Sequence, residues 1–270
     1  MNAPSSTRPG DPQDPAGFAV RLQTLSWRDP TRWLVLGWRD FVRCPAIGLF
    51  YGACFTGMGW ALMKVYEAAP AYVLALSAGF LLMGPFLCLG LYQASRRLEQ
   101  GEHPTLIDSL TAWRERTGTL AIFGLVLLVL EMLWGRASLV VFALSFDGMP
   151  DFKGSLLALL DPDNLQFIVA YLFVGGLFAG LIFAVSVVSI PMILDRPVDA
   201  ITAGIASMRL VLTQTGIALW WGALLTVCVV LAMLPWFAGL LIVGPLLGHA
   251  SWHAYRAAVV VDLADPATAA

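Results

Sequence analysis

The sequence predicts an all-α, polytopic membrane helix bundle: six spans arranged as three hairpins, each preceded by a cytoplasmic amphipathic helix. Three observations predict it. Of 270 residues, 59% are hydrophobic and 13% are charged, whereas soluble domains carry roughly 25% charged residues. Several apolar runs reach the roughly 20 residues that a helix needs to cross a bilayer. Finally, a stretch near the C-terminus has an echo 160 residues earlier, which indicates repeated hairpins.

The echo keeps residue types in register along two of the returning spans. Ala78-Gly-Phe-Leu-Leu-Met-Gly-Pro85 corresponds to Ala238-Gly-Leu-Leu-Ile-Val-Gly-Pro245, and the match continues to Arg96 and Arg256. The repeats all start from one side of the membrane. They are therefore parallel rather than inverted, which weakens an analogy with transporters built from inverted repeats.

Each returning span contains an internal proline, which removes one i→i−4 hydrogen bond. The sequence therefore predicts helix breaks at Gly84, Pro85, Pro191, Gly244 and Pro245. Pro191 sits nearer the cytoplasmic end of its span than the other prolines. Broken helices can line a substrate path, but Gly and Pro are also ordinary in membrane helices, where neighbours satisfy the freed backbone.

The six spans are expected at about residues 45–65, 71–92, 118–146, 165–194, 216–234 and 236–255. The third apolar run has 29 residues. As a helix it would be roughly 43 Å long, so in a hydrocarbon core of roughly 30 Å it must tilt, kink or project. Gly48-x-x-x-Gly52 permits close helix contact in the first span. The fourth span carries the same spacing at Gly176-x-x-x-Gly180.

The first amphipathic segment follows Asp29-Pro30, which has the form of an N-cap and a first-turn proline. Helical spacing places Trp38 and Phe41 on one face, and Asp40 with several arginines on the other. This pattern is typical of a helix in the membrane interface. The alternative is a solvated helix packed on the bundle.

Two further amphipathic segments precede the second and third hairpins. Thr105-Leu-Ile-Asp108 has capping-box spacing and opens the second. The third carries an apolar stripe at helical spacing, formed by Ile201, Ile205, Met208 and Leu212.

The basic residues predict the orientation. Thirteen arginines lie on the side of the termini, and only Lys64 and Lys153 lie on the other. The excess of basic residues on one side predicts that both termini are cytoplasmic. We expect residues 1–26 to be a disordered tail, residues 27–256 a single membrane domain and residues 257–270 a short C-terminal tail.

Five stretches carry a family resemblance: residues 33–40, 79–85, 90–97, 185–195 and 244–256. In them the chain resembles the bacterial integral-membrane family known as domain of unknown function 2189. The resemblance covers roughly residues 25–258. It implies a six-span protein of the bacterial inner membrane and supplies no activity.

Two ionisable residues, Glu131 and Arg136, lie inside the third apolar run. Charged residues within spans suggest function by default. At i, i+5 the two side chains are about 140° apart on a helix, so they cannot pair simply. They are therefore expected to make structural polar contacts with other spans or, alternatively, to belong to a transport or proton path.

His249 and His253 are four residues apart, so they lie on one helical face. This spacing can present two imidazoles to one metal, but zinc sites usually need three or four ligands. The expectation is that both are interfacial histidines that hydrogen-bond backbone carbonyls freed in the broken helices. Metal or haem ligation and proton relay are the alternatives, and no cofactor is expected.

The sequence has no phosphate-binding glycine loop, no Ser-His-Asp arrangement and no carboxylate pair at useful spacing, which argues against a soluble-type enzyme. We expect a non-enzymatic scaffold or accessory protein that contacts the lipid bilayer and a membrane-protein partner or a second copy, with no nucleic acid. The alternative is a small-solute permease or channel that uses the broken helices, Glu131 and Arg136.

Overall fold

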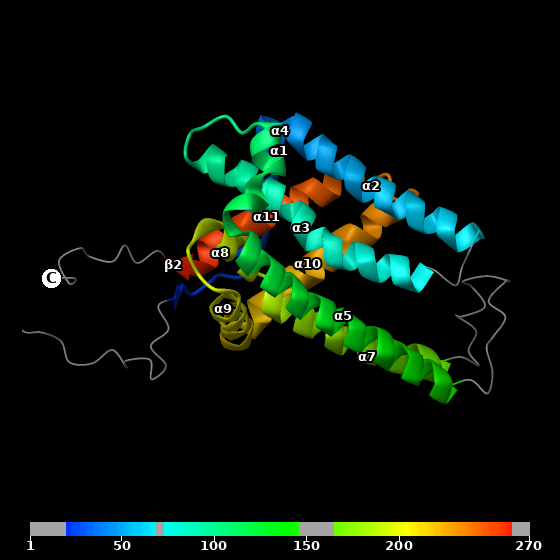
Figure 1. The fold of residues 1–270 in the computed structure, drawn as a ribbon. Coiled ribbons are helices and arrows are strands. Elements are labelled where there is room, and N and C mark those ends of the chain that lie inside the picture. Colours follow the sequence, from blue (N-terminus) through cyan, green and yellow to red (C-terminus); the bar gives the residue numbers. More distant parts are fainter. Residues whose placement is uncertain (1–19, 69–72, 146–164, 261–270) are drawn as a thin grey trace, which may run out of the picture.

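The computed structural model describes residues 20–68, 73–145 and 165–260, without the side chains of residues 73–75 and 78. Most of both expected tails, and Lys153, lie outside the described residues. The fold is all-α apart from one short two-stranded sheet (Figure 1). The elements are β1 (Arg21–Leu22), α1 (Asp29–Arg43), α2 (Pro45–Ala68), α3 (Val73–Glu99), α4 (Leu106–Leu110), the 3₁₀-helix η2 (Ala112–Arg116), α5 (Thr117–Ser145), α7 (Leu165–Ser186), α8 (Ser189–Asp195), α9 (Ala200–Thr213), α10 (Thr215–Met233), α11 (Leu240–Ala258) and β2 (Val259–Val260).

Four described stretches are long and apolar enough to cross a membrane: Pro45–Ala68, Leu106–Ser145, Leu165–Asp195 and Thr215–Met233. They contain the first, third, fourth and fifth expected spans. The helices of the second and sixth, α3 and α11, are not among them, so the six-span hairpin arrangement is not confirmed.

The last span also begins later than expected. Trp236 and Phe237 have φ angles of 53° and 63°, in the left-handed region that few side chains adopt. They form a turn, and α11 starts only at Leu240. The turn is held against α2, because the indole of Trp60 donates to the carbonyl of Trp236 at 2.7 Å.

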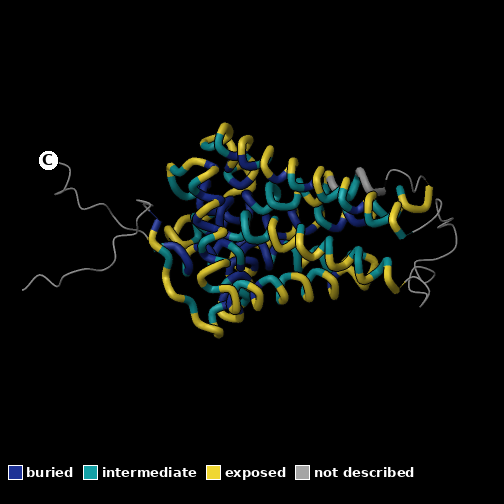
Figure 2. Tube along the Cα trace, turned by 90° about the horizontal axis from the view of Figure 1, so that it is seen from below, coloured by how far each residue is buried: buried dark blue, intermediate teal, exposed yellow. Residues whose placement is uncertain are grey.

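Buried residues gather at the end of the bundle that carries β1, β2, α1 and α8, here called the terminal end (Figure 2). Towards the opposite end most of the described residues are intermediate or exposed. Helix α7 has no buried residue at all, and Leu172 and Phe173 on it are 67% and 66% exposed. Helices that are apolar all round and still exposed are suited to a lipid environment.

Helix α11 is the central element of the terminal end, where α1, α2, α3 and α10 pack around it. Two glycines let neighbours cross it closely. A Cβ atom on Gly37 of α1 would lie 2.7 Å from the backbone nitrogen of Ala250, and one on Gly52 of α2 would overlap the carbonyl of Leu241. The close contact expected at Gly52 is confirmed.

The second glycine motif behaves differently. Added Cβ atoms on Gly176 and Gly180 would meet nothing within 4 Å. Among the described residues no helix approaches these two glycines closely, and they leave open space along α7.

The proline positions correct another expectation. Helices α3 and α11 continue through Gly84-Pro85 and Gly244-Pro245 without a break. Losing one i→i−4 bond does not end a helix whose neighbours and remaining bonds hold it. Only the third position is associated with a break, because α7 ends at Ser186 and α8 begins at Ser189, two residues before Pro191.

The amphipathic helices are present, but the expected place of Asp40 on the polar face of the first is wrong. The capping box of Thr105 and Asp108 is confirmed. In α1, Asp40 lies on the buried face at 5% exposure, whereas Trp38 is 48% exposed. In α9 the apolar stripe points outward, with Ile201 69% exposed, and a face of small residues is buried instead.

The two ends of the described chain meet in a sheet that the sequence does not predict. Strands β1 and β2 pair antiparallel, with Arg21 opposite Val260 and Leu22 opposite Val259. Val20 and Val259 are buried. Parts of both expected tails are therefore packed against the core.

The crossing at Gly37 gives a test of the packing. We expect Gly37→Ala to lower the thermal stability of the detergent-solubilised protein, by about 1–3 kcal/mol, because the new methyl overpacks against the backbone of α11. Gly57→Ala is the control, since its methyl would meet nothing within 4 Å. Equal melting temperatures for the two variants would show that the helices do not cross this closely.

Candidate functional site

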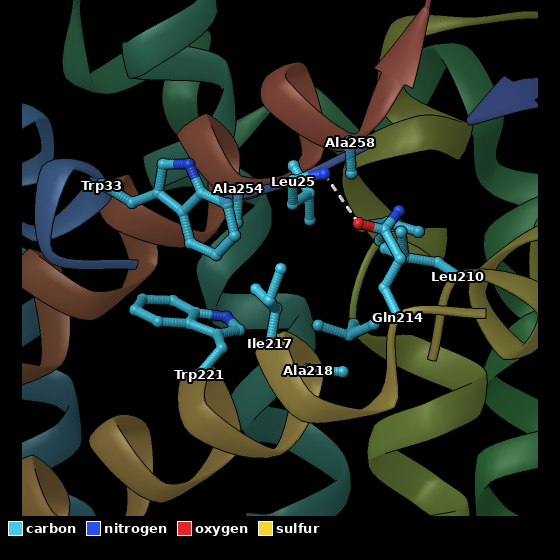
Figure 3. Close-up of a pocket in the computed structure, with 11 residues that line it drawn as sticks. Leu25, Trp33, Leu210, Gln214, Ile217, Ala218, Trp221, Ala254 and Ala258 are labelled. Atoms are coloured by element: carbon cyan, nitrogen blue, oxygen red, sulfur yellow. Dashed lines mark hydrogen bonds between the residues drawn. The ribbon is translucent and has the colours of Figure 1, made fainter. Parts of the chain in front are cut away.

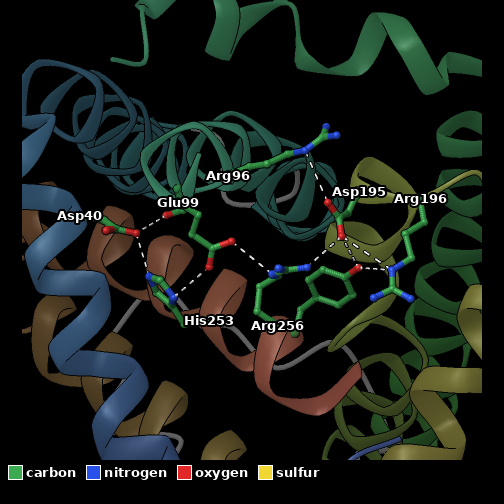
Figure 4. A network of polar contacts seen from close by, with 9 residues as sticks. Asp40, Arg96, Glu99, Asp195, Arg196, His253 and Arg256 are labelled. Carbon is green, nitrogen blue, oxygen red and sulfur yellow. Dashed lines mark hydrogen bonds and ion pairs between the residues drawn. The ribbon is translucent and has the colours of Figure 1, made fainter. Parts of the chain in front are cut away.

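A network of polar side chains lies inside the terminal end and joins four helices with the residue after α8 (Figure 4). Its members come from α1, α3, α8 and α11, and several are buried in a core that is otherwise apolar. They are Asp40, Ser95, Arg96, Glu99, Asp195, Arg196, His249, His253, Tyr255 and Arg256.

Asp40 is the centre of the first half of the network. It lies three residues after Gly37, so it shares the face of α1 that crosses α11. Its Oδ2 accepts hydrogen bonds from Ser95 Oγ at 2.7 Å and His253 Nε2 at 2.8 Å. Burial acts to raise the pKa of Asp40, but the bonds from His253 and Ser95 outweigh it and hold the pKa below the ordinary value.

His249 is fully buried and extends the same chain of bonds. Its Nδ1 lies 2.8 Å from Ser95 Oγ. Ser95 has one hydroxyl hydrogen, which is donated to the Asp40 carboxylate, so Nδ1 carries a hydrogen and donates to Ser95. Nε2 has no partner of normal hydrogen-bond geometry, although the ring interacts with the carbonyl of Leu91.

His253 links this half to the second half. While its Nε2 bonds to Asp40, its Nδ1 lies 3.7 Å from Glu99 Oε1. The other oxygen of Glu99 lies 3.2 Å from Arg256 Nε. A ring protonated on both nitrogens would pair with two carboxylates at once, which is an arrangement suited to a stable ion cluster and also to proton exchange.

Asp195 is the centre of the second half. It lies 3.5 Å from both Arg96 Nε and Arg256 Nη1, and Tyr255 donates a hydrogen bond to it at 2.7 Å. Arg96 and Arg256 are equivalent positions of the sequence echo. Both of these arginines therefore share the Asp195 carboxylate, and a third cation, Arg196, lies 3.7 Å from it.

The structure brings His249 and His253 together, through Ser95 and Asp40, but it keeps the other candidates apart. Glu131 on α5 is 9% exposed, and its buried Oε2 has no hydrogen-bond partner. Arg136 is exposed, and no ion pair joins it to Glu131. Neither residue is a member of the network, whose residues on α3, α8 and α11 lie at the terminal end.

Sequence reasoning missed most of the network, including Asp40, Ser95 and Asp195. One signal was available, because the echo paired Arg96 with Arg256 and two neighbouring cations are stabilised by an anion between them. Asp195 ends the stretch 185–195 that carries part of the family resemblance. For Asp40 the helical pattern was misleading, since it grouped the carboxylate with the exposed arginines.

The two histidines do not converge on an empty ligand position. In the described part of the chain no group of three or more His, Cys, Asp or Glu residues could hold a metal ion. The ring nitrogens that face Ser95 and Asp40 are already engaged in hydrogen bonds. As a ligand set, this arrangement is poorer than structural zinc sites require.

Two cavities adjoin the network. One of about 340 Å³ opens beside α1 and reaches His253 and Arg256, so this edge of the network is accessible from outside. The other, of about 20 Å³, lies between the Trp33 and Trp221 rings and Gln214, whose Oε1 accepts a 2.7 Å bond from the Leu25 N–H (Figure 3). It has room for about one water and for no larger ligand.

Comparison with known proteins identifies a family for the central part of the chain. The model described as "Predicted integral membrane protein (DUF2189)" matches residues 73–195. The expected resemblance is confirmed over this range, which includes Ser95, Arg96, Glu99 and Asp195. No curated protein and no solved structure matches the chain.

The lowered pKa of Asp40 predicts a pH dependence. Its ionised form stabilises the fold above the ordinary carboxyl pKa of about 4, and this contribution is lost as the pH falls through the lower pKa of the folded state. We expect the melting temperature of the wild type to fall below about pH 4. Asp40→Asn should melt at a lower temperature at neutral pH, and its melting temperature should fall less steeply in acid. Glu67→Gln, at an exposed ion pair, serves as the control. An equally steep fall of the melting temperature in Asp40→Asn and in the wild type would contradict the role given to the Asp40 carboxylate.

The hydrogen-bonded histidines predict the result of a metal analysis. Protein purified mildly from its native membrane should contain no stoichiometric metal and show no haem absorption band, because one nitrogen of each ring is engaged by Ser95 or Asp40 and the described residues supply no group of three metal ligands. Near-stoichiometric metal that disappears in the His249→Ala, His253→Ala double variant would overturn this reading.

Proposed function

We propose that this chain, whose residues 73–195 carry the integral-membrane family DUF2189, is a non-enzymatic scaffold or accessory protein of the bacterial inner membrane. The observation that supports it is the charge balance of the network. Two carboxylates, Glu99 and Asp195, face three arginines. The third carboxylate, Asp40, bonds to Ser95 and His253, and His249 bonds to Ser95. Charged groups that neutralise one another within the protein hold the helices together, and they leave few free charges to bind a substrate.

The proposed topology has six spans with both termini in the cytoplasm. Helix α3 has 27 residues, and its part up to Ser95 contains no Asp, Glu, Lys or Arg, so it is long enough to be the second span. The sixth consists of α11 with the preceding turn. The arginines gather at the terminal end, which faces the cytoplasm under the positive-inside rule.

The exposed face of α1 supports an accessory role. Val35, Trp38 and Val42 are 54%, 48% and 57% exposed and follow helical spacing, while the opposite face is fixed on α11. A rigidly held apolar face next to arginines suits either the membrane interface or a partner subunit. We propose a membrane-protein partner, with lipid covering the face when the partner is absent.

A small-solute permease is the second candidate, and one observation favours it. Glu131 is a buried carboxylic acid within a candidate span and has an unpartnered oxygen. Such groups mark ion or proton paths in other membrane proteins. The continuous α3 and α11 remove the broken helices from this hypothesis, and the exposed Arg136 does not pair with Glu131.

A photo-crosslinking experiment in native membranes separates the two functions. A photoreactive residue in place of Trp38 should capture one protein, whereas the same residue in place of Trp60, 55% exposed near the other end of α2, should not. Adding Val35→Ser and Val42→Ser should reduce the capture at least several-fold. Purified protein in liposomes should give no solute flux.

The opposite outcome is equally specific. Flux in liposomes that disappears in Glu131→Gln, together with no protein captured at Trp38, would replace the scaffold with the permease. Leu133→Gln, a polar substitution at a 50% exposed position of the same helix, is the control for the effect of a new polar group in α5.

A further inference from the structure

A groove of about 420 Å³ lies on the side of the bundle between the first and second hairpins. This volume is in the range of small-molecule sites, about 300–1,000 Å³. Its walls come from α3 and α5, and α4 with η2 lies over its terminal end. The lining residues that matter most are Tyr51, Met83, Gly90, Leu110, Trp113 and Ala121.

The floor of the groove has its polar groups satisfied internally. Ser109 is buried, and its hydroxyl lies 2.9 Å from both the carbonyl of Gly90 and the hydroxyl of Tyr51. The absence of a side chain at Gly90 is required, because a Cβ atom there would overlap the Tyr51 hydroxyl. The remaining surface of the groove is apolar. A peptide backbone bound there would lack hydrogen-bond partners, whereas a hydrocarbon chain needs none.

The rim has the residues of a membrane interface. Trp113 is 48% exposed, and the Arg114 guanidinium lies 5.9 Å from the centre of its ring. Neither Arg114 nor Arg116 makes an ion pair with any described residue, and one acidic residue, Glu115, lies between them. Trp and Arg together are typical of the headgroup level of a bilayer.

The groove is continuous with the surface that faces lipid. Beside it on α5, Ile122 and Leu125 are 57% and 59% exposed, and on α3 Leu81 and Met83 are 59% and 51% exposed. A lipid in the bilayer can therefore enter sideways without crossing a polar barrier. Its acyl chain would run between α3 and α5, and its phosphate would reach the arginines of η2.

From these observations we propose that the groove is a specific site for an anionic phospholipid, with one acyl chain between α3 and α5 and the headgroup phosphate at Arg114 and Arg116. This site is separate from the polar network and does not depend on the proposed function. It lies where the two hairpins diverge, so the lipid fills a space that the protein leaves open.

Native mass spectrometry of the full chain in detergent, with added phosphatidylglycerol, tests the site. We expect the wild type to retain one tightly held lipid. Ala121→Trp and Met83→Trp, which fill the groove from opposite walls, should weaken its retention about tenfold or more, because several buried methylene groups are displaced. Leu125→Trp, on the lipid-facing side of the same helix, is the matched control and should bind as the wild type does.

A second pair of variants tests the headgroup contact. Arg114→Gln with Arg116→Gln should remove the preference for phosphatidylglycerol over phosphatidylcholine while one lipid is still retained. Equal retention by wild type, Ala121→Trp and Met83→Trp would overturn the proposal, as would equal loss in Leu125→Trp. Inorganic phosphate that displaces the lipid completely would also overturn it, by showing that the arginines bind an anion without the acyl chain.

Discussion

The buried carboxylate of Asp40 is the constraint on which the terminal end of the bundle depends. An ionised group removed from water is costly unless it is paired and hydrogen-bonded. Asp40 finds its partners only where α1 crosses α11 at Gly37, because Ser95 and His253 then lie within 2.8 Å of it. Apolar contacts alone allow two helices to pack in several relative positions. A buried carboxylate that needs hydrogen-bond partners selects one of these positions.

The second carboxylate, Asp195, imposes the same constraint on the repeats. Arg96 and Arg256 occupy equivalent positions in the sequence echo, and each lies 3.5 Å from an oxygen of Asp195. Asp195 comes from outside the echo, at the end of the short helix α8. Two cations brought this close together would repel, so the carboxylate between them lets α3, α8 and α11 meet at the terminal end.

The sequence predicts the all-α class, the capping box at Thr105 and the close approach at Gly52, because each depends on local spacing. It also places His249 and His253 on one face. It could not predict their partner, since Asp40 and His253 are 213 residues apart. The placing of Asp40 on the polar face of α1 was wrong for another reason. Periodicity shows that two faces differ, but in a bilayer the face of large apolar residues can be the outer one, while small and polar residues are buried.

The same reasoning explains why the lipid groove lies beside the second hairpin. Helices α5 and α7 pack on each other through an aromatic cluster in which Trp134 lies 5.3 Å from Tyr171 and 6.0 Å from Phe178. These contacts are internal to the hairpin. At the terminal end it is attached to the first hairpin by the ion pair of Asp195 with Arg96. Beyond that ion pair α3 and α5 are held by apolar contacts, such as Phe86 against Gly124, and the apolar groove lies beside these contacts. In a membrane, the exposure of the apolar groove carries no free-energy cost if an acyl chain covers it. The ion pair of Asp195 with Arg96 and the proposed lipid site therefore both follow from the distribution of charge along the chain.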